Sequence, residues 1–112
     1  MTQVVELPLF SDPYYEYTMS LQDQSFIFTF RWMERTRDWY LDIRLDDLTP
    51  VVLNYKLVTY YPMMVDYVLS SYGLTGYFLL SDSGTFETSK LSDSVESLSN
   101  YYRLFYVYEE EE

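Results

Sequence analysis

An alternating pattern between residues 25 and 45 constrains the fold more than any other stretch. In SFIFTFRWMERTRDWYLDIRL, large apolar side chains occupy every second position on both sides of the polar stretch Met33–Asp38. A period of two places each apolar row on one face of a β-strand. A short polar segment between two such rows is typical of a hairpin. The predicted hairpin core consists of Phe26, Phe28, Phe30, Trp32, Trp39, Leu41 and Ile43.

The register of this hairpin follows from the same pattern. If Trp32 faces Trp39, every large apolar residue of one arm meets one of the other: Phe30 with Leu41, Phe28 with Ile43, and Phe26 with Leu45. A slip of one residue would turn a whole apolar row to the wrong face, so the register is well specified. Two strands are only marginally stable alone. The rest of the chain must therefore cover this face.

The remaining sequence contains further short segments rich in β-formers. Tyr14–Leu21 alternates and leads through a polar turn into the hairpin, which predicts an antiparallel meander of strands 14–21, 25–33 and 38–45. Other strands are expected at Val4–Leu7, Val51–Tyr60, Tyr77–Leu80 and Tyr101–Tyr108. One face of Val51–Tyr60 is expected to hold Leu53, Tyr55 and Leu57. One face of Tyr101–Tyr108 is expected to hold Tyr102, Leu104, Tyr106 and Tyr108.

These segments predict an all-β fold, an antiparallel meander forming a small barrel or sandwich with at most one short helix. At 112 residues the chain has the size of one domain, which we place at residues 1–108, followed by a solvated acidic tail at 109–112. A helical turn is expected around Asp93–Leu98. The sequence leaves the structure of Met63–Tyr72 and Thr85–Asn100 open.

The composition argues against catalysis. The chain has no Cys and no His, which removes thiol nucleophiles, thiolate and imidazole metal ligands, and the usual base near neutral pH. Its three glycines do not form a phosphate-binding loop. The loop acids Asp46, Asp47 and Asp82 lack the twelve-residue calcium pattern. We therefore expect no enzyme, no catalytic residue, no cofactor and no metal site.

The charge balance bears on partners. The net charge is −11, with 18 acids against 7 bases, which disfavours direct binding to a nucleic-acid backbone. It fits a soluble acidic surface; an acidic DNA mimic, acting as a decoy for a host nucleic-acid-binding protein, is the alternative. Apolar runs are far shorter than the ~20 residues of a membrane-spanning helix, and no N-terminal signal is visible. No membrane insertion is expected.

Aromatic and basic side chains are the candidates for contacts. The chain holds 14 Tyr, a residue that suits both half-buried strands and interfaces. Three arginines cluster near the hairpin tip, where they either dock a partner or, as we favour, pair with Glu34, Asp38 and Asp42. Trp32 and Trp39 lie on the uniformly apolar face, so we favour core packing over a platform for stacking sugars or bases. A Tyr/Trp-based carbohydrate-binding module is the second alternative function. The candidate partner contacts are Arg31, Arg35, Arg37, Tyr40, Tyr101 and Tyr106.

The segment FRWMERTRDWYLDI resembles the signature of small phage tail proteins of the baseplate plug family. The matching positions are Arg31, Trp32, Trp39, Tyr40, Leu41, Asp42 and Ile43. The N-terminal Leu7-Pro8-Leu9 is similar to the opening of the family, and Leu98 with the strand Tyr102–Val107 to its ending. The chain departs from the pattern at Met33, where the family has asparagine, and in Glu34–Arg37, which lacks the usual glycine.

The resemblance implies a structural role in the baseplate of a contractile phage tail. Such proteins are small β domains near the hub and spike that occupy or close the lumen of the tail tube until the genome is released. It implies hub, spike and tube proteins as partners, a location in the virion after synthesis in the host cytoplasm, and no catalytic residue or cofactor. An exposed strand edge, aided by Tyr side chains, is the contact mode we expect.

Overall fold

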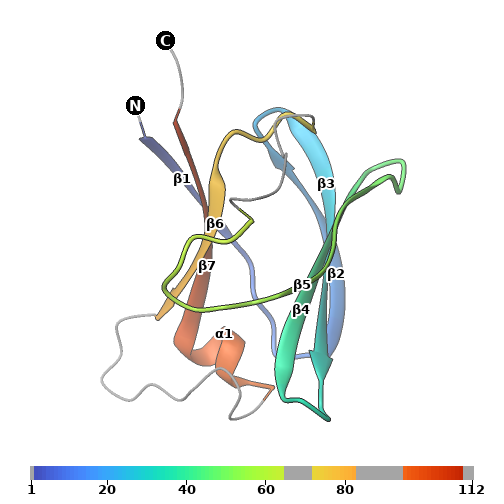
Figure 1. Ribbon diagram of the computed structural model, residues 1–112, viewed down its shortest axis with the longest axis vertical. Coiled ribbons are helices and arrows are strands. Elements are labelled where there is room, and N and C mark those ends of the chain that lie inside the picture. Colours follow the sequence, from blue (N-terminus) through green and yellow to red (C-terminus); the bar gives the residue numbers. More distant parts are fainter. Residues whose placement is uncertain (1, 65–71, 83–94, 110–112) are drawn as a thin grey trace.

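The computed structural model describes residues 2–64, 72–82 and 95–109, which form two antiparallel β-sheets lying face to face (Figure 1). The described elements are β1 (Thr2–Leu7), β2 (Tyr14–Leu21), β3 (Gln24–Met33), β4 (Asp38–Leu45), β5 (Pro50–Lys56), β6 (Tyr77–Asp82), α1 (Ser97–Tyr101) and β7 (Tyr102–Glu109). The all-β prediction is confirmed, and of the two architectures considered the molecule adopts the sandwich, since neither sheet closes into a barrel.

The larger sheet is the predicted meander, with strand order β2-β3-β4-β5. Trp32 pairs with Trp39, Phe30 with Leu41, Phe28 with Ile43 and Phe26 with Leu45, as the alternation predicts. β2 pairs with β3 in an unbroken register from Tyr14–Arg31 to Leu21–Gln24. The inner row of each strand is therefore in line with that of its neighbour, because successive side chains alternate between the two faces.

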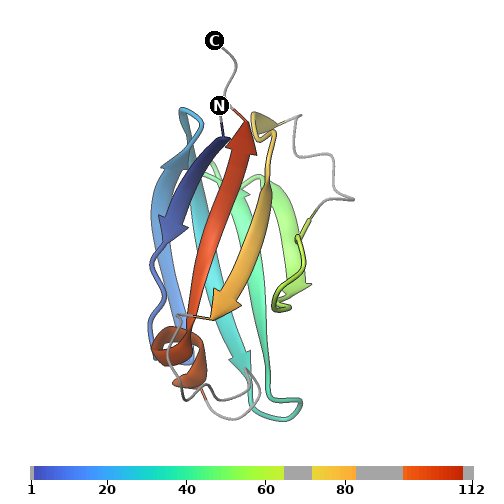
Figure 2. The ribbon, with the colours of Figure 1, turned by 90° about the vertical axis from the view of Figure 1, so that its left-hand side faces the viewer.

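The smaller sheet joins the two ends of the chain. Its order is β1-β7-β6, and β1 pairs with β7 from Thr2–Glu109 to Leu7–Leu104. β1 ends at Leu7, directly before Pro8, which has no N–H to donate to a ladder. Figure 2 shows this sheet in front of the larger one, with β1 and β2 along the same side of the molecule.

The core lies between the sheets. All predicted hairpin-core residues are fully buried except Trp32, which is half-buried and packs against Trp39 with ring centroids 5.7 Å apart. The smaller sheet contributes Leu104, Tyr106 and Phe78, and Phe78 meets Phe28 of the larger sheet at 6.3 Å. The predicted inner face of the last strand is confirmed, with Tyr102, Leu104 and Tyr106 buried and Tyr108 half-buried.

The prediction of a strand at Val51–Tyr60 was wrong in part. β5 ends at Lys56, and between Val52 and Tyr55 it carries an extra residue relative to β4, with Asn54 at a φ of 56°. A bulge sets two residues opposite one and shifts the alternation. Val52 is consequently buried while Leu53, expected on the inner face, is 44% exposed.

The C-terminal part also differs from expectation. The helix lies at Ser97–Tyr101 rather than around Asp93–Leu98, of which residues 93–94 lie outside the described residues. Glu109, expected to begin a solvated tail, is the last residue of β7, because it pairs with Thr2. Most of the two segments left open by the sequence, residues 65–71 and 85–94, also lies outside the described residues.

Candidate interaction surface

The predicted contact residues divide between the hairpin tip, the outer face of the larger sheet and the smaller sheet. Arg35 and Arg37 lie in the exposed turn between β3 and β4. The Arg37 N–H donates to the Met33 carbonyl at 2.7 Å, and Arg37 has a φ of 55°, so a single helical turn closes the hairpin. The tip and α1 lie at the same end of the molecule, opposite the chain termini (Figure 1).

Arg31 belongs to a polar cluster on the outer face. Its guanidinium donates to Asp42 Oδ1 at 3.1 Å and to the Asn54 side chain. Asp42 is buried, accepts from the Asn54 backbone N–H at 2.7 Å, and lies 3.8 Å from the guanidinium of Arg44. Because a buried carboxylate needs partners, this cluster has a structural function: it anchors the bulge of β5 to β4.

The pairing expected at the tip is thus partly observed. Arg31 pairs with Asp42 as predicted, whereas Asp38 pairs with Lys56 at 3.5 Å and Glu34 accepts from the Trp32 indole N–H. Trp39 is fully buried in the core. The core interpretation of this tryptophan is confirmed, and it does not form part of an open stacking platform.

The three candidate tyrosines occupy different environments. Tyr40 is half-buried opposite Arg31 on the outer face, and Tyr101 is half-buried at the end of α1. Tyr106 is fully buried, so the expectation that it contacts a partner is corrected. Alternation along β7 placed Tyr106 on the inner face, but only the position of the opposing sheet determines that this face is covered.

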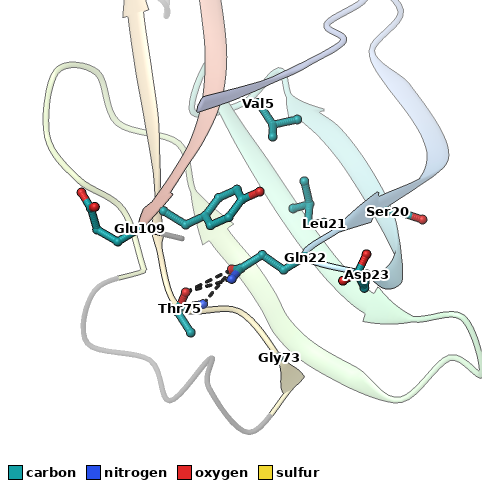
Figure 3. Close-up of a pocket in the computed structure, with 9 residues that line it drawn as sticks. Val5, Ser20, Leu21, Gln22, Asp23, Gly73, Thr75 and Glu109 are labelled. Atoms are coloured by element: carbon teal, nitrogen blue, oxygen red, sulfur yellow. Dashed lines mark hydrogen bonds between the residues drawn. The ribbon is translucent and has the colours of Figure 1, made fainter. Parts of the chain in front are cut away.

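The Tyr106 hydroxyl instead ties the sheets together through Gln22. It accepts from the Gly76 N–H at 3.0 Å and donates to the Gln22 side-chain oxygen. Gln22 also accepts from the Thr75 N–H at 2.9 Å and donates to the Thr75 hydroxyl at 2.9 Å (Figure 3). Burial is the main cause that raises the pKa of the Tyr106 phenol, so it stays protonated as a donor.

A groove that the sequence did not predict adjoins this network. It has a volume of about 1030 Å³ and lies between β1 and the end of β2 (Figure 3). Its lining is Val5, Ser20, Leu21, Gln22, Asp23, Gly73, Thr75, Tyr108 and Glu109. The lining mixes apolar and polar groups and contains no basic residue, so the groove suits an extended chain better than an anion.

Other kinds of site receive no support in the part of the chain that the structure describes. There, no three acids lie close enough together to hold a metal ion. The one described helix, α1, has five residues, and no described helix is long and apolar enough to cross a membrane.

Comparison with known families bears directly on the functional interpretations. Residues 4–110 match the family model described as Cyanophage baseplate Pam3 plug gp18. The chain belongs to this family of phage baseplate plug proteins. No curated protein gives a significant match. The match extends over both sheets, so it covers the midsection as well as the hairpin that carries the resemblance.

Family membership makes the chain a structural component of a phage tail baseplate, where it interacts with other baseplate proteins. A structural component acts through the contacts that its surface makes with its neighbours. The functional residues are therefore sought on exposed strand edges and faces, and the groove beside β2 is the feature that sequence reasoning missed. The absence of Lys and Arg before Arg31 was the signal that could have drawn attention to this side.

Proposed function

We propose that the protein packs beside the hub and spike at the end of the tail tube and helps to close the tube lumen until the genome is released. The observation that carries the proposal is the family match over residues 4–110. Two properties support it. The sandwich buries a rigid aromatic core, and its net charge of −11 disfavours contact with DNA in the conduit.

The family match favours this structural function over the DNA mimic and the carbohydrate-binding module. Two of the described acids also accept hydrogen bonds within the larger sheet. Asp42 holds the bulge of β5, and Glu16 accepts from the Thr29 hydroxyl at 2.7 Å. Asp42 is buried on the outer face, so it does not contribute to the row of exposed, phosphate-like charges that a DNA mimic requires.

Deleting the gene from the phage tests the proposal. We expect tails that fail to complete their baseplate or that release their contents early, and we expect a plasmid copy of the gene to restore infectivity. The measurements are electron microscopy of the particles, plaque titre and nuclease-accessible DNA. Tails of normal structure and infectivity that lack the protein would contradict the proposed function.

A further inference from the structure

The edge strands of the two sheets differ in how well their free backbone groups are protected. The outer side of β6 is covered, since Met63 pairs with Phe78 and the Tyr60 N–H donates to the Leu80 carbonyl at 2.8 Å. β5 begins with Pro50 and is interrupted by the bulge at Asn54. Prolines, bulges and covering segments all prevent the addition of another strand.

β2 has none of these protections. Its eight residues, Tyr14–Leu21, pair with β3 without a register shift and include no proline and no lysine. The Trp32 N–H donates to the Pro13 carbonyl at 2.7 Å, which sets the phase of the ladder. Hydrogen-bonded and non-bonded pairs alternate, so the odd-numbered residues bond β3 and the even-numbered ones direct their N–H and C=O to the free side. No described residue bonds to them there.

The side chains beside this edge define what an added strand would meet. On the inner face, Tyr15, Tyr17 and Met19 are half-buried, and the Phe10 ring packs against the rings of Tyr15 and Tyr17. The groove adjoins only the end of the strand, at Ser20 and Leu21. On the outer face, Glu16 and Thr18 are exposed. Because side chains alternate along a strand, every second residue of an added segment would enter an aromatic environment, and the others would lie beside Glu16.

The negative charge beside β2 favours a basic partner segment. Residues 1–30 contain no Lys or Arg, and acids lie two residues before β2, within it and two residues after it, at Asp12, Glu16 and Asp23. A second copy of the chain would bring together two edges of like charge and two molecules of net charge −11. A basic segment is attracted to the same edge and approaches it faster.

We propose that β2 accepts, by strand addition, an extended segment of another baseplate protein in which apolar residues alternate with Lys or Arg. Main-chain hydrogen bonds at Tyr14, Glu16, Thr18 and Ser20 provide the affinity, and the alternating side chains provide the specificity. The partner class rests on the proposed function, but the basic, alternating character of the segment rests on the edge itself.

A peptide experiment tests the edge directly. The probe is an end-capped octapeptide that alternates valine and lysine, with a valine–glutamate octapeptide of the same length as the charge control. In amide hydrogen exchange followed by NMR, we expect the lysine peptide to protect the amides of Tyr14, Glu16, Thr18 and Ser20. In the presence of the glutamate peptide, these amides should exchange as fast as they do in the free protein. Equal effects of both peptides, protection confined to other strands, or no binding of either would overturn the proposal.

Substitutions of Thr18 test whether the backbone carries the binding. Thr18→Pro removes one N–H on the free side and leaves the bonds to β3 in place, whereas the matched control Thr18→Val keeps the N–H. We expect Thr18→Pro to weaken peptide binding at least tenfold and Thr18→Val to leave it unchanged. If Thr18→Pro does not fold, Thr18→Lys serves instead, and its added positive charge should also weaken binding of the lysine peptide. Unchanged binding in a folded variant would overturn the proposal.

The same variants in the phage separate this inference from the proposed function. If gene deletion blocks tail assembly but Thr18→Pro is incorporated as well as Thr18→Val, the function stands and the inference fails. If deletion is harmless while the peptide still requires the β2 amides, the proposed function fails and the edge remains a strand-binding site.

Discussion

Tyr17 packs its ring against the core, but its buried hydroxyl group disfavours the folded state. Its ring lies 5.7 Å from those of Phe28 and Phe30 and 6.4 Å from that of Phe10. Its hydroxyl is buried, with no hydrogen-bond partner among the described residues. Burial, more than the neighbouring Tyr15, raises the pKa of the Tyr17 phenol, because desolvation penalises the phenolate.

Replacing Tyr17 with Phe should therefore stabilise the protein, by up to about 1 kcal/mol at neutral pH, since it removes an unsatisfied buried group. The effect should grow in alkali. Unfolded tyrosine ionises near pH 10, whereas folded Tyr17 keeps its proton, so the stability present below pH 10 is lost as the pH rises towards the higher folded pKa. Tyr17→Phe should make the alkaline loss of stability less steep.

Urea unfolding at pH 7 and at several values above 10 measures both effects. Tyr14→Phe is the matched control, because Tyr14 lies on the same strand but is 61% exposed. If the two variants respond alike to alkali, the burial of Tyr17 is not the cause.

At the scale of elements, the β2–β3 hairpin has a turn type that its two turn residues do not indicate. The two turn residues, Gln22 and Asp23, have φ values of 49° and 68°. Positive φ at both positions is the two-residue turn that usually holds Asn-Gly. Gln22 is retained in this conformation because its side chain reaches Thr75 and Tyr106. Asp23 is exposed, and no such contact offsets the conformational cost of its positive φ.

Asp23→Gly should consequently stabilise the protein by about 0.5–1 kcal/mol, because glycine adopts positive φ without the clash of a Cβ atom. Thermal unfolding should show a rise of about 2–5 °C in Tm. The control is Asp12→Gly at an exposed site without positive φ, which should lower the Tm slightly. A lower Tm for Asp23→Gly would show that the carboxylate itself stabilises the turn.

At the scale of the whole molecule, the segment before β6 passes directly against β7. A Cβ atom on Gly76 would lie 1.9 Å from the Val107 carbonyl oxygen and 2.7 Å from Tyr108 Cβ. The Gly76 N–H also donates to Tyr106, which connects to Gln22. Only glycine permits this close approach of two backbones, and the approach aligns the bonds that join the smaller sheet to the β2–β3 turn.

Gly76→Ala should destabilise the protein by about 3 kcal/mol, at the upper end of overpacking costs, because backbone atoms rather than a flexible side chain must move. Gly73→Ala is the matched control: it meets open space but has a φ of +89°, so it should cost about 1 kcal/mol. Chemical denaturation of both variants measures the difference. Equal losses would contradict a close contact at Gly76.

The hairpin and its register were predictable because alternation and cross-strand pairing are local properties of the chain. Phe26 to Trp32 could be set against Trp39 to Leu45 from the printed letters alone, and the resemblance to the plug family was drawn from that same stretch. The bulge at Asn54 was not predictable in this way, because it depends on the buried carboxylate of Asp42 in the neighbouring strand.

The division into two sheets and the state of each strand edge required the tertiary structure. Val4 pairs with Val107 across nearly the whole chain, and no local pattern reports a contact at that separation. The same alternation made Tyr106 and Tyr40 look equivalent, yet one is sealed by the opposing sheet and the other lies on the outer face. Periodicity tells which side chains share a face; only the packing of distant strands decides which faces and edges remain open to a partner.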